Sequence, residues 1–195
     1  MCKKFKTGLL FLAAFLSLGG CGKTADMPKE ESSTVQESAD TSSSEAEGSV
    51  SQIAFEGKDM EGNTVSSEIF SESKLTMVNV WATHCNPCLR EMPDLGELAG
   101  EYDPEELRII GIVSDVQEGA DQKTIDHASD LIEQTGADYT HLLLNESVYY
   151  ALLTDVTGVP TTFFIDSDGV ILDTVIGSKD KSVWEEKINA LLEEQ

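Results

Sequence analysis

The chain predicts an α/β fold in which a central mixed β-sheet is flanked by helices on both faces. Three observations support this prediction. Apolar strand patterns alternate with helix-length patterns along residues 52–195, as they do in layered α/β domains. The chain ends in a hairpin followed by an amphipathic helix, so some strands of the sheet must be antiparallel. A Cys-x-x-Cys pair, Cys85 and Cys88, also lies where an apolar strand runs into a helix.

The first half of this domain predicts a short hairpin, a buried strand and a long helix. Residues 53–65 are the hairpin, with its turn at residues 61–63. Residues 75–82 are apolar enough for a strand that is buried on both faces. The helix is expected over residues 86–102, with an interruption at Pro93 that should kink it, because proline removes one of the hydrogen bonds of a helix interior.

The second half predicts another buried strand and another helix before the terminal hairpin. The strand covers residues 107–113, and the helix covers residues 123–134 and ends before Gly136. The elements that follow are a short strand at 140–144, a helix at 147–153, strands at 161–166 and 170–176 joined by a turn at 167–169, and a helix at 181–192.

Cys85 and Cys88 have the layout of a thiol-disulfide exchange site. Asn86 and Pro87 lie between them, and Pro87 falls in the first turn of a helix, where a missing amide proton costs nothing. Helix amides and the helix dipole favour a thiolate at the exposed N-terminus. We therefore expect Cys85 to attack the substrate and Cys88, the more buried sulfur, to resolve the mixed disulfide.

A zinc half-site is the alternative interpretation of this cysteine pair. Only His84, His127 and His141 could add ligands, and no second cysteine pair follows in the domain. Exchange chemistry is therefore preferred, and no metal or other cofactor is expected. His127 and His141 are interpreted as ordinary surface residues.

The N-terminal segment predicts export and lipid anchoring. Residues 1–20 combine a basic start with a short apolar run, which is typical of a signal peptide. They lead into Leu-Gly-Gly-Cys ending at Cys21, which resembles the lipobox of bacterial lipoproteins, where the cysteine receives lipid. The protein is then expected to be extracytoplasmic and lipid-anchored to the bacterial cell membrane. An ordinary signal peptide with a free Cys21, or an uncleaved anchor, is the alternative.

Residues 21–51 are predicted to be a disordered tether between the lipid on Cys21 and the folded domain. They are rich in Ser, Thr, Glu, Asp and Ala and contain almost no large apolar side chain. Such a segment cannot bury enough surface to fold. The domain itself, residues 52–195, is long enough for one hydrophobic core.

The charge of the chain excludes one class of partner. It has 13 basic and 36 acidic residues, a formal net charge of −23. No basic stripe could neutralise phosphates, so nucleic-acid binding is not expected. Loss of the basic signal peptide would also leave little attraction to anionic lipid. The charge is interpreted as a solvated exterior and not as a binding face.

Four motifs together carry a family resemblance. They are Trp81-Ala82-Thr83, Cys85-Asn86-Pro87-Cys88, Glu91-Met92-Pro93 and Gly158-Val159-Pro160-Thr161. The combination resembles the thioredoxin superfamily, and specifically its membrane-tethered, extracytoplasmic TlpA/ResA branch, over nearly all of residues 51–195. The resemblance implies a thioredoxin-like fold with an N-terminal hairpin and with a helix and a strand inserted within residues 114–145.

The resemblance also implies roles for residues around the cysteines. A redox-active Cys85–Cys88 disulfide would lie against a cis bond between Val159 and Pro160, and the Val159 backbone would pair with an extended substrate segment. The alternative is that residues 158–160 are only a turn before a strand.

Glu91 matches an acidic residue that carries protons in this branch. One helical turn places it near Cys88, where a partly desolvated carboxyl would have a raised pKa and could exchange protons with that thiol. Asn79, which cannot titrate, holds the position of the buried aspartate of ordinary thioredoxins. The alternative is an ordinary solvated helical glutamate.

Other residues near the pair are expected to tune it. His84 departs from the aromatic residue that often precedes the first cysteine. A protonated imidazole would favour the thiolate of Cys85 and make the pair more oxidising, whereas a neutral one would only fill the surface. Asn86 and Pro87 belong to the dipeptide that sets the redox potential, and Trp81 is expected to pack beneath the site.

The function implied by the resemblance is a thiol-disulfide oxidoreductase that works in the reducing direction. Its electrons would come from a membrane donor of the CcdA/DsbD type. Its clients would be extracytoplasmic proteins with disulfides or related oxidised sulfur, such as apocytochrome c, methionine sulfoxide reductases or peroxidases. Two alternatives remain, a peroxiredoxin-like peroxidase and a non-catalytic copper or haem carrier. The peroxidase would need a Pro-x-x-x-Thr-x-x-Cys pattern, whereas Thr83 lies only two residues before Cys85.

Overall fold

The computed structural model describes residues 52–195, and a five-stranded mixed sheet forms the centre of this part of the chain. Its strand order is β5-β4-β3-β6-β7. The pairs β3–β4 and β4–β5 are parallel, whereas β3–β6 and β6–β7 are antiparallel. The strands are β3 (Leu75–Trp81), β4 (Leu107–Gln117), β5 (Thr140–Leu144), β6 (Thr161–Asp166) and β7 (Ile171–Ile176).

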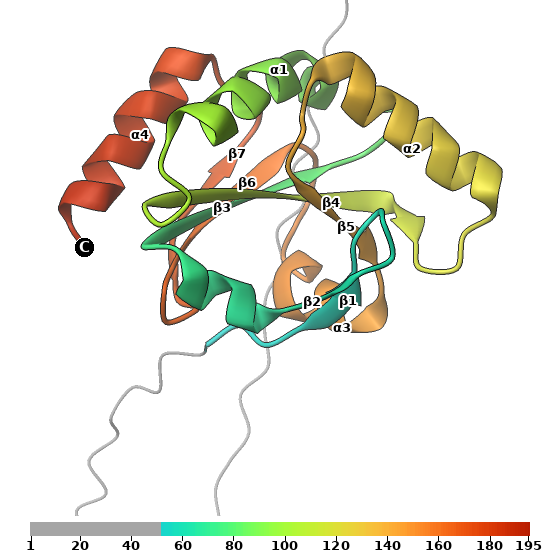
Figure 1. Cartoon of the computed structure of the whole chain (residues 1–195), viewed down its shortest axis with the longest axis horizontal. Helices are drawn as coiled ribbons and strands as arrows, with labels where there is room; N and C mark the ends of the chain where they lie inside the picture. Colours follow the sequence, from blue (N-terminus) through green and yellow to red (C-terminus); the bar gives the residue numbers. More distant parts are fainter. Residues whose placement is uncertain (1–51) are drawn as a thin grey trace, which may run out of the picture. The chain divides into compact units, whose positions relative to one another are not determined.

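Helices cover both faces of this sheet, as the sequence predicts (Figure 1). One face carries α1 (Asn86–Glu101), α2 (Gln122–Thr135) and α4 (Lys181–Glu193). The other face carries shorter elements (Figure 1). They are the hairpin of β1 (Glu56–Lys58) and β2 (Thr64–Ser66), the 3₁₀-helix η1 (Ser67–Glu72), the short helix α3 (Glu146–Val148) and the π-helical turn η2 (Tyr149–Leu153).

Strand β3 is the centre of the core, and all seven of its residues are buried. Its side chains alternate between the two faces of the sheet. Val78 and Val80 pack in one hydrophobic cluster beneath the hairpin and η1, whereas Met77 packs with α1 and α4. The last residue, Trp81, joins the cluster that contains both cysteines of the Cys-x-x-Cys pair. The strand thus leads directly from the core into the predicted site.

The N-terminal hairpin forms with its turn where it is predicted, but its strands are shorter and lie later. Asp59 holds the turn, because its Oδ1 accepts hydrogen bonds from the backbone amides of Asn63 at 2.7 Å and Glu61 at 3.1 Å. Only three residues pair on each side. The sequence pattern could not show this, because a buried carboxylate that accepts several amide hydrogen bonds fixes the turn more strongly than strand propensity does.

Two helical predictions need correction. The interruption at Pro93 does not occur: α1 continues through it, because Met92, Leu95 and Leu98 are fully buried and their packing holds the helix together. The expected helix at 147–153 is instead the short α3 followed by the π-helical turn η2. The 3₁₀-helix η1 was not expected, since its six residues are too few to show a helical period.

The predicted signal peptide, the lipobox cysteine Cys21 and the tether lie outside the described residues. Within residues 52–195, no helix has the length and apolar character needed to cross a membrane.

Candidate active site

Cys85 and Cys88 form a disulfide at the N-terminus of α1, with the two sulfurs 2.07 Å apart. Cys85 is the N-cap residue, and its Sγ accepts a hydrogen bond from the Cys88 amide at 3.3 Å. Cys85 is 7% exposed and Cys88 is 0% exposed. Cys85 therefore keeps a small exposed surface, whereas Cys88 keeps none. Asn86 is exposed beside it, and Pro87 lies in the first helical turn.

The loop before β6 lies against this disulfide. The peptide bond between Val159 and Pro160 is cis, and the Val159 carbonyl oxygen is 3.6 Å from Cys85 Sγ. A sulfur in a disulfide carries no hydrogen, so this approach is a van der Waals contact. Thr161 stabilises the loop, since its hydroxyl donates to the Gly158 carbonyl at 2.7 Å. The backbone of Val159 therefore borders the reactive sulfur.

The loop that leads into Cys85 is held by Asp115, near the end of β4. Asp115 accepts hydrogen bonds from the Thr83 amide at 3.0 Å and from the Thr83 hydroxyl at 2.6 Å. The Nδ1 of His84, whose side chain is 78% exposed, lies 3.0 Å from the same carboxylate. Burial alone would raise the pKa of Asp115, but the hydrogen bonds from Thr83 and His84 bring that pKa below its ordinary value.

Asp115 is a site residue that sequence reasoning missed. The signal was present, because Asp115 is a carboxylate shortly after the buried run at residues 107–113. Parallel strands β3 and β4 end at the same edge of the sheet, so polar side chains that follow them meet there. The loop conformation of Thr83 and His84, which sequence cannot supply, brings them to this carboxylate.

Glu91 is buried behind the cysteines, only 2% exposed. Its Oε1 accepts a hydrogen bond from the Asn79 side-chain amide at 3.0 Å, and its Oε2 accepts one from the Lys179 backbone amide at 3.1 Å. Desolvation by burial raises the pKa of Glu91, and these hydrogen bonds offset only part of that effect. The alternative of a solvated helical glutamate is therefore wrong.

Asn79 connects Glu91 to the neighbouring strand. Its amide nitrogen also donates to the Thr162 hydroxyl at 3.0 Å, and its own Oδ1 is buried without a partner among the described residues. Burial raises the pKa of the Tyr139 hydroxyl, and the negative charge of Glu91 raises it further. Glu91 is thus a carboxyl of raised pKa within a group of buried polar side chains.

Trp81 packs beneath the disulfide and is fully buried, in one cluster with both cysteines. Its Nε1–H donates to Nδ1 of His141 at 3.1 Å, and Nε2–H of His141 donates to the Ala137 carbonyl at 2.9 Å. His141 is 2% exposed, so its interpretation as a surface residue is wrong. Any Cβ on Gly111 would lie 2.0 Å from His141 Nδ1. A glycine at that position makes room for the ring.

The buried His141 predicts a loss of stability in mild acid. Burial lowers its pKa from 6.5 to about 4, so between these pH values the unfolded chain binds a proton that the folded chain does not. Stability should therefore fall by about 3 kcal/mol as the pH drops through this window. Urea unfolding at several pH values measures the slope. His141→Gln should flatten it, whereas the same change at the exposed His127 should not. Equal slopes in the two variants would contradict the assignment.

No group of three or more His, Cys, Asp or Glu side chains among residues 52–195 is placed to hold a metal ion. What the site does hold is a reducible disulfide with one accessible sulfur, a backbone carbonyl beside that sulfur and a buried carboxyl behind the pair.

Comparisons with known proteins agree with this description. The AhpC/TSA family model matches residues 50–174. The thiol:disulfide interchange protein DsbE of Haemophilus influenzae is 30% identical over 131 residues, which are 67% of this chain and 66% of that protein. The thiol:disulfide interchange protein HelX of Rhodobacter capsulatus is 33% identical over 121 residues, 62% of each protein. The matched region thus spans slightly less than two thirds of the length of these relatives.

Solved structures agree on the fold. A thioredoxin-family thiol:disulfide interchange protein from Chlorobium tepidum superposes with a TM-score of 0.61 at 23% identity, covering 72% of this chain and 94% of that one. StoA from Bacillus subtilis superposes with a TM-score of 0.55 at 18% identity, covering 70% of this chain and 97% of that one. The fold is therefore thioredoxin-like, as the resemblance implies.

Proposed function

The chain belongs to the AhpC/TSA family and has a thioredoxin-like fold, and on this premise we propose that it is an extracytoplasmic thiol-disulfide oxidoreductase that reduces disulfides in client proteins. One observation carries the proposal. Of the two disulfide-bonded cysteines at the start of α1, Cys85 keeps a small exposed surface and Cys88 keeps none. This asymmetry suits a cycle with one attacking and one resolving sulfur.

The proposed cycle begins with the reduced pair. The thiolate of Cys85 attacks one sulfur of the client disulfide, that bond breaks, and the first client sulfur leaves as a thiolate that takes up a proton from water. The thiol of Cys88 then gives its proton to the carboxylate of Glu91 and attacks Cys85 Sγ. The mixed disulfide breaks and the second client sulfur leaves, to be protonated in turn. The client gains two electrons, and the pair ends as the disulfide seen here.

The surroundings of the pair support particular roles within this cycle. The Val159 backbone borders Cys85 Sγ, so it is placed to pair with an extended client segment. The second proposed role is tuning of the pair by His84, Asn86 and Pro87 at the surface and by Trp81 from below. Relatives named thiol:disulfide interchange proteins support the same class of reaction.

The cellular setting of the proposal comes from the N-terminal sequence. Residues 1–20 would be a lipoprotein signal peptide, Cys21 would carry the lipid, and residues up to 51 would be the tether of the domain at 52–195. A membrane protein of the CcdA/DsbD type would then return electrons to the pair. Apocytochrome c, a methionine sulfoxide reductase or a peroxidase would be the client.

A peroxidase function has less support in the geometry. In the peroxidase pattern a threonine three residues before the reactive cysteine would have its hydroxyl available to that sulfur. Here the Thr83 hydroxyl donates to Asp115 at 2.6 Å. The Thr83 hydroxyl therefore helps to hold the loop before Cys85.

The reduction potential of the Cys85/Cys88 couple tests the reducing direction. We expect a value of roughly −220 mV or lower, in the range of glutaredoxins and thioredoxin. The purified protein would be equilibrated with defined thiol and disulfide buffers, and its two redox states would be separated after alkylation. A value near about −120 mV would contradict the proposal, because it marks a disulfide-forming oxidant. His84→Phe, measured in parallel, would show whether the histidine raises the potential.

A further inference from the structure

Two neighbouring hollows extend from the redox site along the edge where β4 and β5 end. The first has a volume of about 280 Å³ and is lined in part by Val159, Leu144 and Tyr149. The second has a volume of about 430 Å³ and shares Leu144 and Tyr149 with the first. We call the two together the client groove. Ligands of open α/β sheets bind outside the carboxyl ends of the strands, which is where this groove lies.

The groove begins beside the reactive sulfur. Val159, at its near end, places its carbonyl oxygen 3.6 Å from Cys85 Sγ. A polypeptide whose disulfide reaches Cys85 can therefore place adjoining residues next to the first hollow. The second hollow follows across the wall formed by Leu144 and Tyr149.

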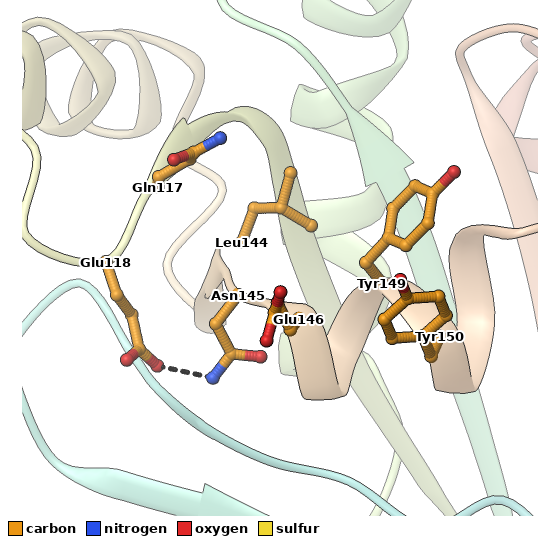
Figure 2. A pocket seen from close by; sticks show the side chains of 7 residues that line it. All are labelled: Gln117, Glu118, Leu144, Asn145, Glu146, Tyr149 and Tyr150. Carbon is orange, nitrogen blue, oxygen red and sulfur yellow. Dashed lines mark hydrogen bonds between the residues drawn. The ribbon is translucent and has the colours of Figure 1, made fainter.

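The far end of the groove is acidic. Glu118 and Glu146 line the second hollow, and no lysine or arginine within residues 52–195 lines either hollow. Glu118 is held in place, because its Oε1 accepts hydrogen bonds from the Lys58 amide at 2.6 Å and from the Asn145 side chain at 2.9 Å (Figure 2). Oε2 of Glu118 has no hydrogen-bond partner within residues 52–195. One carboxylate oxygen is thus fixed and the other remains available to a ligand.

Two exposed aromatic rings complete the groove. Tyr149 is 44% exposed and Tyr150 is 70% exposed. Both lie in the π-helical turn η2, and their ring centroids are 5.4 Å apart. Figure 2 shows these rings at one end of the hollow and Glu118 at the other. Aromatic faces next to carboxylates attract the apolar stem and the charged head of lysine or arginine.

We propose that the client groove binds the polypeptide segment that adjoins the client's disulfide and selects segments with lysine or arginine. The inference rests on the proposed function, and it adds the class of client. Charge complementarity carries it, because Glu118 and Glu146 line the groove with no lysine or arginine among the described residues beside them, and the whole chain has a net charge of −23. That field would also speed the encounter with a basic client.

Paired peptides test the inference. Two synthetic peptides, each closed by one disulfide, would differ only in carrying arginines or glutamines on both sides of it. We expect the reduced protein to reduce the arginine peptide about tenfold faster at low salt, the size expected from two weak charge contacts together with cation–π contact. Glu118→Gln with Glu146→Gln should lower this ratio to less than about twofold. Both charges are then removed, while the amide introduced at position 118 can still accept hydrogen bonds through its oxygen.

A matched control separates the groove from the overall charge. Glu61→Gln with Glu133→Gln removes the same two charges from a different hollow, and should leave the arginine preference unchanged. Equal losses in both double variants would overturn the inference. Tyr150→Ser, at a mostly exposed position, should lower the preference without affecting the fold, and no change in that variant would also count against it.

An uncharged small probe separates this inference from the proposed function. Bis(2-hydroxyethyl) disulfide is too small to extend along the groove, so its reduction by the unaltered protein reports on the Cys85/Cys88 pair alone. If the unaltered protein fails to reduce this probe, the proposed function fails. If it reduces the probe but does not distinguish the peptides, only the inference about the groove fails.

Discussion

Cys88→Ser protein should accumulate as a mixed disulfide with its client, whereas Cys85→Ser protein should neither trap a client nor turn over. The first variant keeps the accessible sulfur and loses the one that resolves the intermediate. The second keeps only a sulfur that is 0% exposed, which a client disulfide cannot reach. Turnover should fall by at least about 10³-fold in both, since each removes a reacting atom. Non-reducing electrophoresis followed by mass spectrometry measures the trapped species.

The double variant Cys85→Ser with Cys88→Ser is the control for this experiment. Any adduct that it forms comes from Cys2 or Cys21, the other two cysteines of the chain, and is subtracted. Trapping by Cys85→Ser as efficient as that by Cys88→Ser would reverse the assignment of the two sulfurs. Such trapping would also require the first turn of α1 to open, because Cys88 is enclosed there in a hydrophobic cluster.

The sequence predicts the parts of this site that depend on local spacing. The strand predicted over residues 75–82 and the helix predicted to begin at residue 86 are both found, as β3 (Leu75–Trp81) and α1 (Asn86–Glu101), because an uninterrupted apolar run and a proline in the first turn are local signals. Burial of Glu91 follows from the helical period, which places it on the same side as Cys88. These features need no knowledge of the neighbouring strands.

His141 shows why the rest could not be predicted. Histidine in a short strand pattern gives no sign of burial, and the space for its ring comes from Gly111 on the adjacent strand, which is its direct partner in the β4–β5 register. Trp81, two strands away in the sheet, supplies its hydrogen-bond donor. Burial of a polar ring therefore depends on two residues that are distant in sequence, and only the folded arrangement satisfies it.

The resemblance and the residues contribute differently to the site. The motif around Pro160 indicates which loop lies against the disulfide, but the contact between the Val159 carbonyl and Cys85 is a property of the fold. In the same way, no motif marks Asp115. Its role in holding Thr83 becomes visible only when the ends of β3 and β4 are adjacent.

Glu91→Gln should slow turnover by about 10²-fold or more, the usual contribution of a general acid or base. Glutamine keeps one acceptor oxygen, which can still take the hydrogen bond from the Lys179 amide, and its NH2 group can donate to the unpartnered Oδ1 of Asn79 once that side-chain amide turns over. It cannot carry the proton of Cys88. The trapping step through Cys85 should be nearly unaffected, whereas resolution of the mixed disulfide should be slow. Single-turnover kinetics over a range of pH would measure both steps, and the inflection due to Glu91 should disappear from the second.

The free energy of unfolding gives an independent measure of Glu91. The change Glu91→Gln should raise this free energy at neutral pH, although it lowers the turnover rate. Burial raises the pKa of Glu91 above 4.5 in the folded chain, so the folded chain retains a proton that the unfolded chain loses. The contribution of Glu91 to the free energy of unfolding is fully present below about pH 4.5, and it is lost as the pH rises through the pKa of Glu91 in the folded chain. Glu91→Gln should therefore be more stable than the unaltered protein at neutral pH, and this difference should vanish in acid.

A variant that gains stability while it loses activity would identify Glu91 as a residue held in an unfavourable environment for its chemistry. Glu97→Gln is the matched control, since Glu97 lies on the same helix but is exposed and forms a surface ion pair with Lys181. It should change neither the rate nor the pH dependence of stability, because exposed ion pairs contribute little. If Glu91→Gln gains stability at neutral pH with an unchanged rate, the carboxyl is buried without serving the reaction, and the proton of Cys88 must leave by another route.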